Sequence, residues 1–474
     1  MTADRHGQPM TETGDEAAEH LERALDALVF FRPEVGRETS AAVAAAPRSP
    51  LAQVFSAYLG LLGTEESDAA EARERFGRFR ADLDRAAATP RELAHVDAAS
   101  AWLDGDLRTA GRVLGDLVVA HPHDLLALSV GHQIDFFTGD AGRLRDRVGG
   151  VLSAWDEHDP HHGTLLGMYA FGLEESGHYD RSEQVGLAAV EANPRDVWGI
   201  HAVVHTYEMQ GRFAEGIAYL DARTGDWSSG NYLTVHNWWH YALYAIEAGD
   251  TERALAIYDA ALHNEESEGL AMELLDASAL LWRLLLAGED ESERWSRLAD
   301  AWAARRDGPF YAFNDVHAVM AYLGAGRVGE AETLVGDRQT WLAAPHPGMS
   351  NHAMTEEVGV PVCRALIAFA QGRYDQTVDL LLPLRHRLNT YGGSHAQRDA
   401  VQKTLLEAAI RAGRDDLART LLSERIGVRP SSPYNWLTRA RLAERLGQAA
   451  EAAAARDRAG KLTAGEPTAG GAGA

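Results

Sequence analysis

Four histidines at regular spacing are the residues of this sequence best placed to do chemistry. His201 and His205 are four positions apart, and so are His236 and His240. Residues four apart lie on one face of an α-helix, so each pair places two imidazoles side by side if its segment is helical. Glu208 continues the first face. Imidazoles and a carboxylate on one face are expensive to bury unless they are paired, metal-bound or used in a reaction.

These residues suit two kinds of site. Neutral imidazoles bind Zn, Fe, Ni or Mn, so one divalent transition metal would have as its ligands His201, His205, His236 and His240. Alternatively, a histidine and a carboxylate act as general base and acid, and the catalytic residues are then His201, His205, Glu208, His236 and His240. The sequence lacks the His-Glu-x-x-His pattern of zinc proteases. Spacing alone leaves both sites open, and ordinary buried or surface histidines as well.

Length and composition limit what the chain can be. Its 474 residues are 46% hydrophobic and 24% charged, which is enough apolar material for a large core. The formal net charge of −25 disfavours nucleic acid and anionic membranes as partners, because both are polyanions. The single cysteine, Cys363, excludes an internal disulfide, and no stretch resembles an export signal or a membrane span. We therefore expect a cytoplasmic protein.

Glycine-centred turns recur between helical patterns. Their spacing ranges from 34 residues (Gly105 to Gly139) to 46 (Gly326 to Gly372), and they lie at Gly105, Gly139, Gly177, Gly211, Gly249, Gly288, Gly326, Gly372, Gly413 and Gly447. A period near 34 to 40 residues with glycine between two helical patterns is typical of stacked helical hairpins. The sequence predicts an all-α superhelical array of about ten hairpins, forming one continuous domain over residues 18–460. Residues 1–17 and 461–474 are predicted to be disordered.

Two of the longer intervals contain extra loop. Residues 344–352 and 389–395 are rich in turn-forming residues, and both contain histidine. Loops of this kind on a rigid array often close over a site, so His395, Arg398 and Asp399 are candidates for lining a pocket. The alternative for the same stretch is a helix cap at Ser394 followed by surface charges.

One unit, Tyr169 to Pro194, resembles a tetratricopeptide repeat, with Gly177-His178-Tyr179 at its turn. The resemblance implies that each hairpin's first helix faces the concave side of the superhelix. Its inward positions are then thirteen, ten, six and three residues before the turn glycine. By this rule both histidine pairs face inward, although His240 is one residue away from the inward position at Trp239. Ten hairpins exceed one superhelical turn, so distant units can face one another around a closed lumen.

Three motifs together are similar to the tetratricopeptide repeat protein 38 family. They are His201-x-x-x-His205-x-x-Glu208-Met209-x-Gly211-Arg212, His236-Asn237-Trp238-Trp239-His240 and Gly393-Ser394-His395-Ala396-Gln397-Arg398-Asp399. The similarity runs from about residue 20 to 450 and implies an α-superhelix of atypical repeats. It supplies no reaction, so the functional interpretation rests on the residues.

Two functions compete. The first is a soluble enzyme that takes a small polar molecule into the lumen and acts on it by acid–base chemistry, with or without a metal. The second is an interaction scaffold for a peptide or protein, and a non-catalytic ligand-binding protein would use the same pocket. Peptide-gripping inner faces carry Lys, Arg and Asn, whereas these carry His, Glu, Asp and Trp, which favours the enzyme. The residues expected to bind substrate are His132, Trp198, Trp239, Asp276, Asp315, His317, His395, Arg398 and Asp399.

Overall fold

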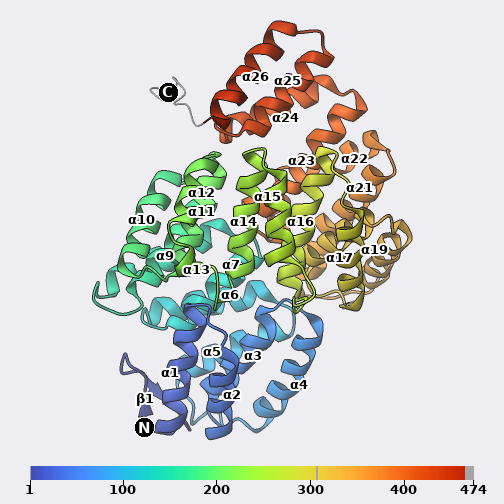
Figure 1. Ribbon diagram of the computed structural model, residues 1–474. Coiled ribbons are helices and arrows are strands. Elements are labelled where there is room, and N and C mark those ends of the chain that lie inside the picture. Colours follow the sequence, from blue (N-terminus) through green and yellow to red (C-terminus); the bar gives the residue numbers. More distant parts are fainter. Residues whose placement is uncertain (1, 306–307, 465–474) are drawn as a thin grey trace.

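The computed structural model describes residues 2–305 and 308–464, and nearly all of them are helical (Figure 1). The first helices are α1 (Asp15–Val29), α2 (Val35–Ala45), α3 (Pro50–Leu62), α4 (Glu66–Asp82), α5 (Pro90–Leu103), α6 (Leu107–Ala120), α7 (Leu125–Phe137), α8 (Ala141–Gly149), α9 (His162–Glu175), α10 (Tyr179–Ala192), α11 (Val197–Gln210), α12 (Phe213–Asp221) and α13 (Thr224–Trp227). The later ones are α14 (Thr234–Glu247), α15 (Thr251–Ile257), α16 (Ala271–Ala287), α17 (Ser292–Ala304), α18 (Ala312–Gly324), α19 (Val328–Leu342), α20 (Ser350–Met354), α21 (Val360–Ala370), α22 (Tyr374–Leu381), α23 (His395–Ala412), α24 (Asp415–Val428), α25 (Pro433–Arg445) and α26 (Ala449–Thr463). Short 3-10 or π segments are η1 (Leu152–Ala154), η2 (Tyr258–Leu262), η3 (Thr355–Gly359), η4 (Leu382–Leu384) and η5 (Leu388–Tyr391).

Each predicted turn glycine ends the first helix of a hairpin, from α5/α6 at Gly105 to α25/α26 at Gly447. All ten have a positive φ, between 65° at Gly139 and 97° at Gly288. Glycine is favoured there because a side chain is strained in that conformation. The predicted array of hairpins is thus confirmed, and the pairs α1/α2 and α3/α4 precede it.

The first helices of successive hairpins stack along the inside of the superhelix. α9 packs on α11, α11 on α14, α14 on α16, α16 on α18, and α18 on α21 (Figure 1). The array also closes on itself, because units far apart in sequence bond to one another. The Ala271 backbone N–H donates to Glu65 (2.9 Å), and the Asn389 side chain donates to the Gly139 carbonyl (3.1 Å).

Helix α23 packs inside this closed array and contacts both α11 and α16. Its polar side chains Arg398, Asp399, Lys403 and Glu407 are buried. The Trp282 indole of α16 donates to the Thr404 hydroxyl at 2.9 Å. A charged helix thus forms part of the protein's interior.

The described parts of both chain ends form regular structure. Residues 2–14 contain β1 (Thr2–Ala3) paired antiparallel with β2 (Pro9–Met10), and α1 already begins at Asp15. Helix α26 continues to Thr463, while residues 465–474 lie outside the described residues. Among the described helices, none combines the length and the apolar character that crossing a membrane requires.

Candidate functional site

The four histidines meet where α11 packs against α14. The ring centroids are 4.4 Å apart for His201 and His205, 4.8 Å for His236 and His240, and 4.3 Å for His205 and His240. One nitrogen from each ring lies within 4.8 Å of one from every other. His201, His205 and His240 are buried, and the His236 side chain is 17% exposed. We call these four residues the histidine cluster.

Three of the four rings face a carboxylate through the same atom, Nδ1. His236 Nδ1 lies 2.7 Å from Asp276 Oδ2, His240 Nδ1 3.4 Å from Glu208 Oε2, and His205 Nδ1 3.6 Å from Glu174 Oε2. For His236 and His240 this contact is a hydrogen bond, so the carboxylate holds the proton at Nδ1 and leaves Nε2 unprotonated in the neutral ring. The longer contact between His205 and Glu174 is not a hydrogen bond. Histidines that bind metals usually have their second nitrogen held in this way.

Several ring nitrogens of the cluster lack partners in the described part of the chain. Both nitrogens of His201, both of His205 and Nε2 of His240 are buried without a hydrogen bond. Each such group costs roughly 1–3 kcal/mol when buried. Burial, as the largest cause, lowers the pKa of His205 to about 3 and that of His201 and His240 well below the usual range. The rings of His201, His205 and His240 are therefore neutral, which is the form that binds a metal.

Aromatic side chains enclose the cluster. Trp198 lies 4.9 Å from His201, Phe171 lies 5.2 Å from His201, and Trp239 stacks on His236 at 5.2 Å between centroids. Trp198 and Trp239 are thus walls of the site, as the inward rule predicts. His132 contacts the edge of Trp198 at 5.7 Å, but its Nε2 lies 3.1 Å from the Met168 carbonyl, so it belongs to the wall.

Glu174 is a residue of the site that the sequence analysis missed. It is fully buried, and neither carboxylate oxygen has a hydrogen-bond partner among the residues that the structure describes. Burial and the neighbouring Glu175 charge raise its pKa well above the usual range. Glu174 lies three positions before Gly177, as Glu208 lies three before Gly211. The inward rule applied to this unit would have found it.

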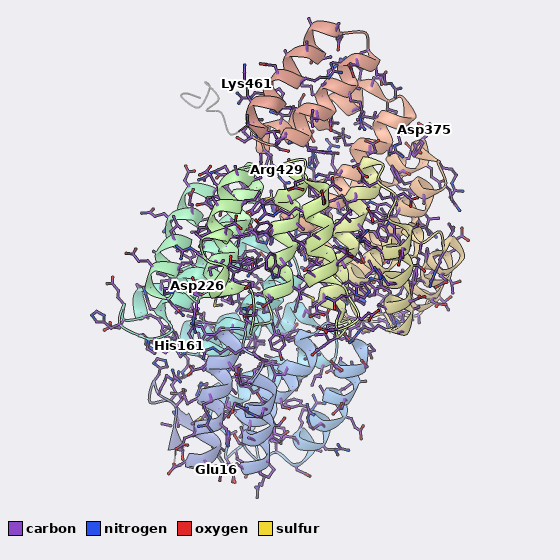
Figure 2. All side chains as sticks on the ribbon, viewed as in Figure 1. Glu16, His161, Asp226, Asp375, Arg429 and Lys461 are labelled. Atoms are coloured by element: carbon purple, nitrogen blue, oxygen red, sulfur yellow. The ribbon has the colours of Figure 1, made fainter. Side chains whose placement is uncertain are left out.

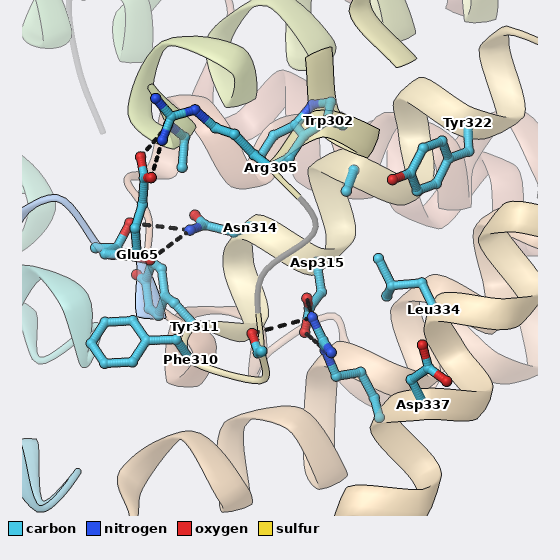
Figure 3. Close-up of a pocket in the computed structure, with 15 residues that line it drawn as sticks. Glu65, Trp302, Arg305, Phe310, Tyr311, Asn314, Asp315, Tyr322, Leu334 and Asp337 are labelled. Atoms are coloured by element: carbon cyan, nitrogen blue, oxygen red, sulfur yellow. Dashed lines mark hydrogen bonds and ion pairs between the residues drawn. The ribbon is translucent and has the colours of Figure 1, made fainter. Parts of the chain in front are cut away.

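Two predicted substrate-binding residues lie elsewhere. Asp315 accepts two hydrogen bonds from Arg338, at 2.8 and 2.9 Å, beside a cavity of about 70 Å³ that Glu65, Trp302 and Tyr311 also line (Figure 3). His317 Nδ1 lies 2.8 Å from the Phe313 carbonyl of its own helix. Neither side chain is among those that contact the histidine cluster. Asp276 is, since it holds His236.

His395, Arg398 and Asp399 line a groove of about 500 Å³ between α23 and α24 on one side and the α7/α8 turn on the other. Figure 2 labels Arg429 at this junction, below the C-terminal helices. Arg398 pairs with Glu175 at 3.1 Å, and Asp399 pairs with Arg425 at 2.6 Å. Ser394 caps α23, as the alternative interpretation of this stretch expects, but Arg398 and Asp399 are buried and are not surface charges.

A layer of carboxylates separates the groove from the histidine cluster. Glu175 reaches His395 at 3.5 Å on the groove side, and the adjacent Glu174 reaches His205. Glu208 is 4.0 Å from Arg429, which lines the groove, and 3.4 Å from His240. The two sites are therefore linked through charged side chains.

The helix that carries His201 and His205 begins at a buried acid, which gives a pH-dependent prediction. Asp196 Oδ1 accepts from the backbone N–H groups of Trp198 and Gly199, and burial raises the Asp196 pKa to about 7 from 3.8. Between pH 4 and 7 the unfolded chain loses this proton while the folded chain keeps it, so stability falls as pH rises through that window. Asp196→Asn keeps the accepting oxygen. We expect it to gain at most about 4 kcal/mol over wild type at pH 8 and nothing at pH 4.

Urea unfolding of both proteins at pH 4 and pH 8 measures this difference. Equal pH dependence in the two proteins would show that Asp196 is ionised in the folded state.

Comparison with known proteins adds likeness of fold only. No family model matches the chain. The human IFIT1 dimer with PPP-AAAA is 14% identical, with 95% of this chain and 96% of that chain covered and a TM-score of 0.41. Yeast Tom70 is 12% identical (94% and 92% covered, TM-score 0.32). A tetratricopeptide repeat protein from Parabacteroides merdae is also 12% identical (67% and 98% covered, TM-score 0.31). By its own hairpins and turns, the chain is an all-α superhelix of tetratricopeptide-like repeats.

Proposed function

We propose that this protein is a metal-binding repeat protein whose histidine cluster holds one divalent transition metal. The observation that carries the proposal is the orientation of the rings. Two of them are hydrogen-bonded to a carboxylate through Nδ1, and both nitrogens of His201, both of His205 and Nε2 of His240 are buried without hydrogen-bond partners among the described residues. Four imidazole nitrogens suit Zn or a neighbouring transition metal better than Mg or Ca, which prefer oxygen.

Elemental analysis of protein purified without chelators tests this proposal. We expect about one equivalent of metal in wild type and none in His201→Ala/His240→Ala. His317→Ala is the matched control, because it also removes a buried imidazole but one bonded to its own helix. It should retain the metal. Absence of metal from wild type, together with no binding when Zn²⁺, Fe²⁺, Ni²⁺ or Mn²⁺ is titrated in, would overturn the proposal.

The groove favours a second function, the binding of a small polar molecule next to the metal. A molecule between His395 and Arg398 would lie one carboxylate layer from His205. Such a molecule is either held without change or converted by acid–base chemistry, in which Glu175 or Glu208 would move a proton. Resemblance to the tetratricopeptide repeat protein 38 family, a cytoplasmic location and a peptide or protein partner stay predictions.

Ligand binding in the groove can be screened with inorganic phosphate and succinate as probes for its arginines. Binding should raise the melting temperature of wild type and of the control His158→Ala, whose side chain is exposed far from the groove. In His395→Ala the increase should be smaller. A probe that is consumed over time would identify an enzyme, whereas equal shifts in all three proteins would place the binding elsewhere.

A further inference from the structure

The N-terminal hairpin is fastened to the body of the protein. Asp4 pairs with Arg91 of α5 at 3.1 Å, and the Thr11 hydroxyl donates to Glu92 at 2.6 Å. Between these two anchors, His6 stacks on His123 with 5.2 Å between centroids. These contacts place the His6 ring over the loop that precedes α9.

That loop supplies two further groups that bind metals. One of them, His161, is only 1% exposed. One atom each from His6, Asp159 and His161 lie within 4.8 Å of one another. His6 Nε2 is 4.0 Å from Asp159 Oδ2, and His161 Nδ1 is 3.7 Å from Asp159 Oδ1. In Figure 2, His161 lies where the N-terminal helices meet the rest of the superhelix.

The two ring nitrogens that face Asp159 lack hydrogen-bond partners. His6 Nε2 and His161 Nδ1 are both buried and unpaired in the described part of the chain. His161 presents its other nitrogen, Nε2, to Asp26 of α1 at 2.8 Å. This carboxylate holds the ring proton at Nε2 and leaves the lone pair of Nδ1 directed at Asp159. Arg5 reaches both Asp26, at 3.1 Å, and His161 Nε2, at 3.4 Å, and it also pairs with Glu22. The shorter contact to Nε2 is the one from Asp26.

We propose that His6, Asp159 and His161 form a second site for a divalent transition metal, which fastens the N-terminal hairpin to the α9 loop. Two imidazoles and a carboxylate are a common ligand set for Zn²⁺, with water in the remaining position. Ligands of a tetrahedral Zn²⁺ at about 2.0 Å are roughly 3.3 Å apart, so the separations of 3.7 and 4.0 Å must shorten by about 0.4 and 0.7 Å. All three ligand atoms already lie within 4.8 Å of one another. This site shares no residue with the histidine cluster.

The test is Zn²⁺ titration of the full chain by calorimetry, with limited proteolysis of the N-terminal hairpin as a second readout. We expect two equivalents in wild type and one in His6→Ala, with Zn²⁺-dependent protection of the hairpin lost in that variant. His158→Ala, in the same loop but exposed, is the control and should behave as wild type. His6 lies outside the helical core, so its replacement leaves the fold intact.

Each result separates this site from the histidine cluster. One equivalent that survives His201→Ala/His240→Ala and disappears with His6→Ala supports the second site even if the cluster binds nothing. Equal Zn²⁺ stoichiometry in wild type and His6→Ala, without protection of the hairpin in wild type, would overturn the inference.

Discussion

Gly139→Ala should lower the free energy of unfolding by about 3 kcal/mol or more, the largest loss expected from any turn glycine. Part of the loss is local, because Gly139 has φ +65° and alanine in that conformation costs about 1 kcal/mol. The larger part of the loss comes from a steric clash at the contact that closes the superhelix. A Cβ on Gly139 would lie 1.7 Å from the Asn389 carbonyl oxygen and 2.6 Å from its carbon, so the η5 backbone must move.

Gly177→Ala separates the two causes. Gly177 has φ +79°, and a Cβ there meets nothing within 4 Å, so only the local cost of about 1 kcal/mol applies. Urea unfolding of both variants should place Gly139→Ala well below Gly177→Ala. Equal losses within about 0.5 kcal/mol would mean that the chain relaxes at the closure without cost. A functional effect is expected as well, because η5 leads directly into α23 and the groove.

The ten glycine turns were predictable because the requirement is local. Each glycine ends a helix in a conformation that other residues avoid, and the residue type alone reports it. The two helix pairs that precede the array, α1/α2 and α3/α4, have no glycine with positive φ at their turns. The α1/α2 turn has Phe31 at φ 55°, and the α3/α4 turn has Thr64 at φ 60°. Their neighbours hold them there, as when Thr64 accepts from Asn314 at 3.0 Å. The spacing of residues in the sequence does not reveal contacts of this kind with distant residues, so these two turns could not be predicted from it.

The inward rule located part of the site. It selects His201 and His205 on α11, while Asp276 on α16 and Asp315 on α18 each lie one position away from a selected residue. Asp276 reaches His236 of the neighbouring inner helix α14, whereas Asp315 pairs with Arg338, a partner from α19 that the sequence does not indicate. Sequence spacing specifies which face a residue occupies. The partner on that face depends on the curvature that all the units together produce.

Burial of α23 could not be predicted for a related reason. Its sequence is strongly charged and resembles a surface helix. In the structure, Asp399 is neutralised by Arg425 at 2.6 Å and Arg429 at 3.3 Å, both contributed by the next helical segment. These arginines, acting against burial, hold the Asp399 pKa well below its usual range. A charged helix can be buried when residues from other parts of the chain supply the opposite charges that pair with it.

Asp276→Asn should weaken metal binding at the histidine cluster by about 10- to 100-fold while leaving the fold intact. Asp276 Oδ2 is 2.7 Å from His236 Nδ1, the shortest of the three contacts between ring and carboxylate. The negative charge stabilises the Nδ1 proton and makes Nε2 a stronger ligand. Asparagine keeps the size and one oxygen but removes the charge. It therefore changes the ligand strength of His236 without removing the ring.

Competition with a chromophoric chelator measures the affinity of each protein for the same metal. Glu273→Gln is the matched control, since it makes the same carboxylate-to-amide change one turn earlier on α16 at a half-buried position. It should bind as wild type, whereas His201→Ala/His240→Ala should lose binding altogether. Equal affinity in Asp276→Asn and wild type would show that His236 does not ligate the metal through Nε2. The site would then rest on the three buried rings, and the carboxylates beside them would serve the groove rather than the metal.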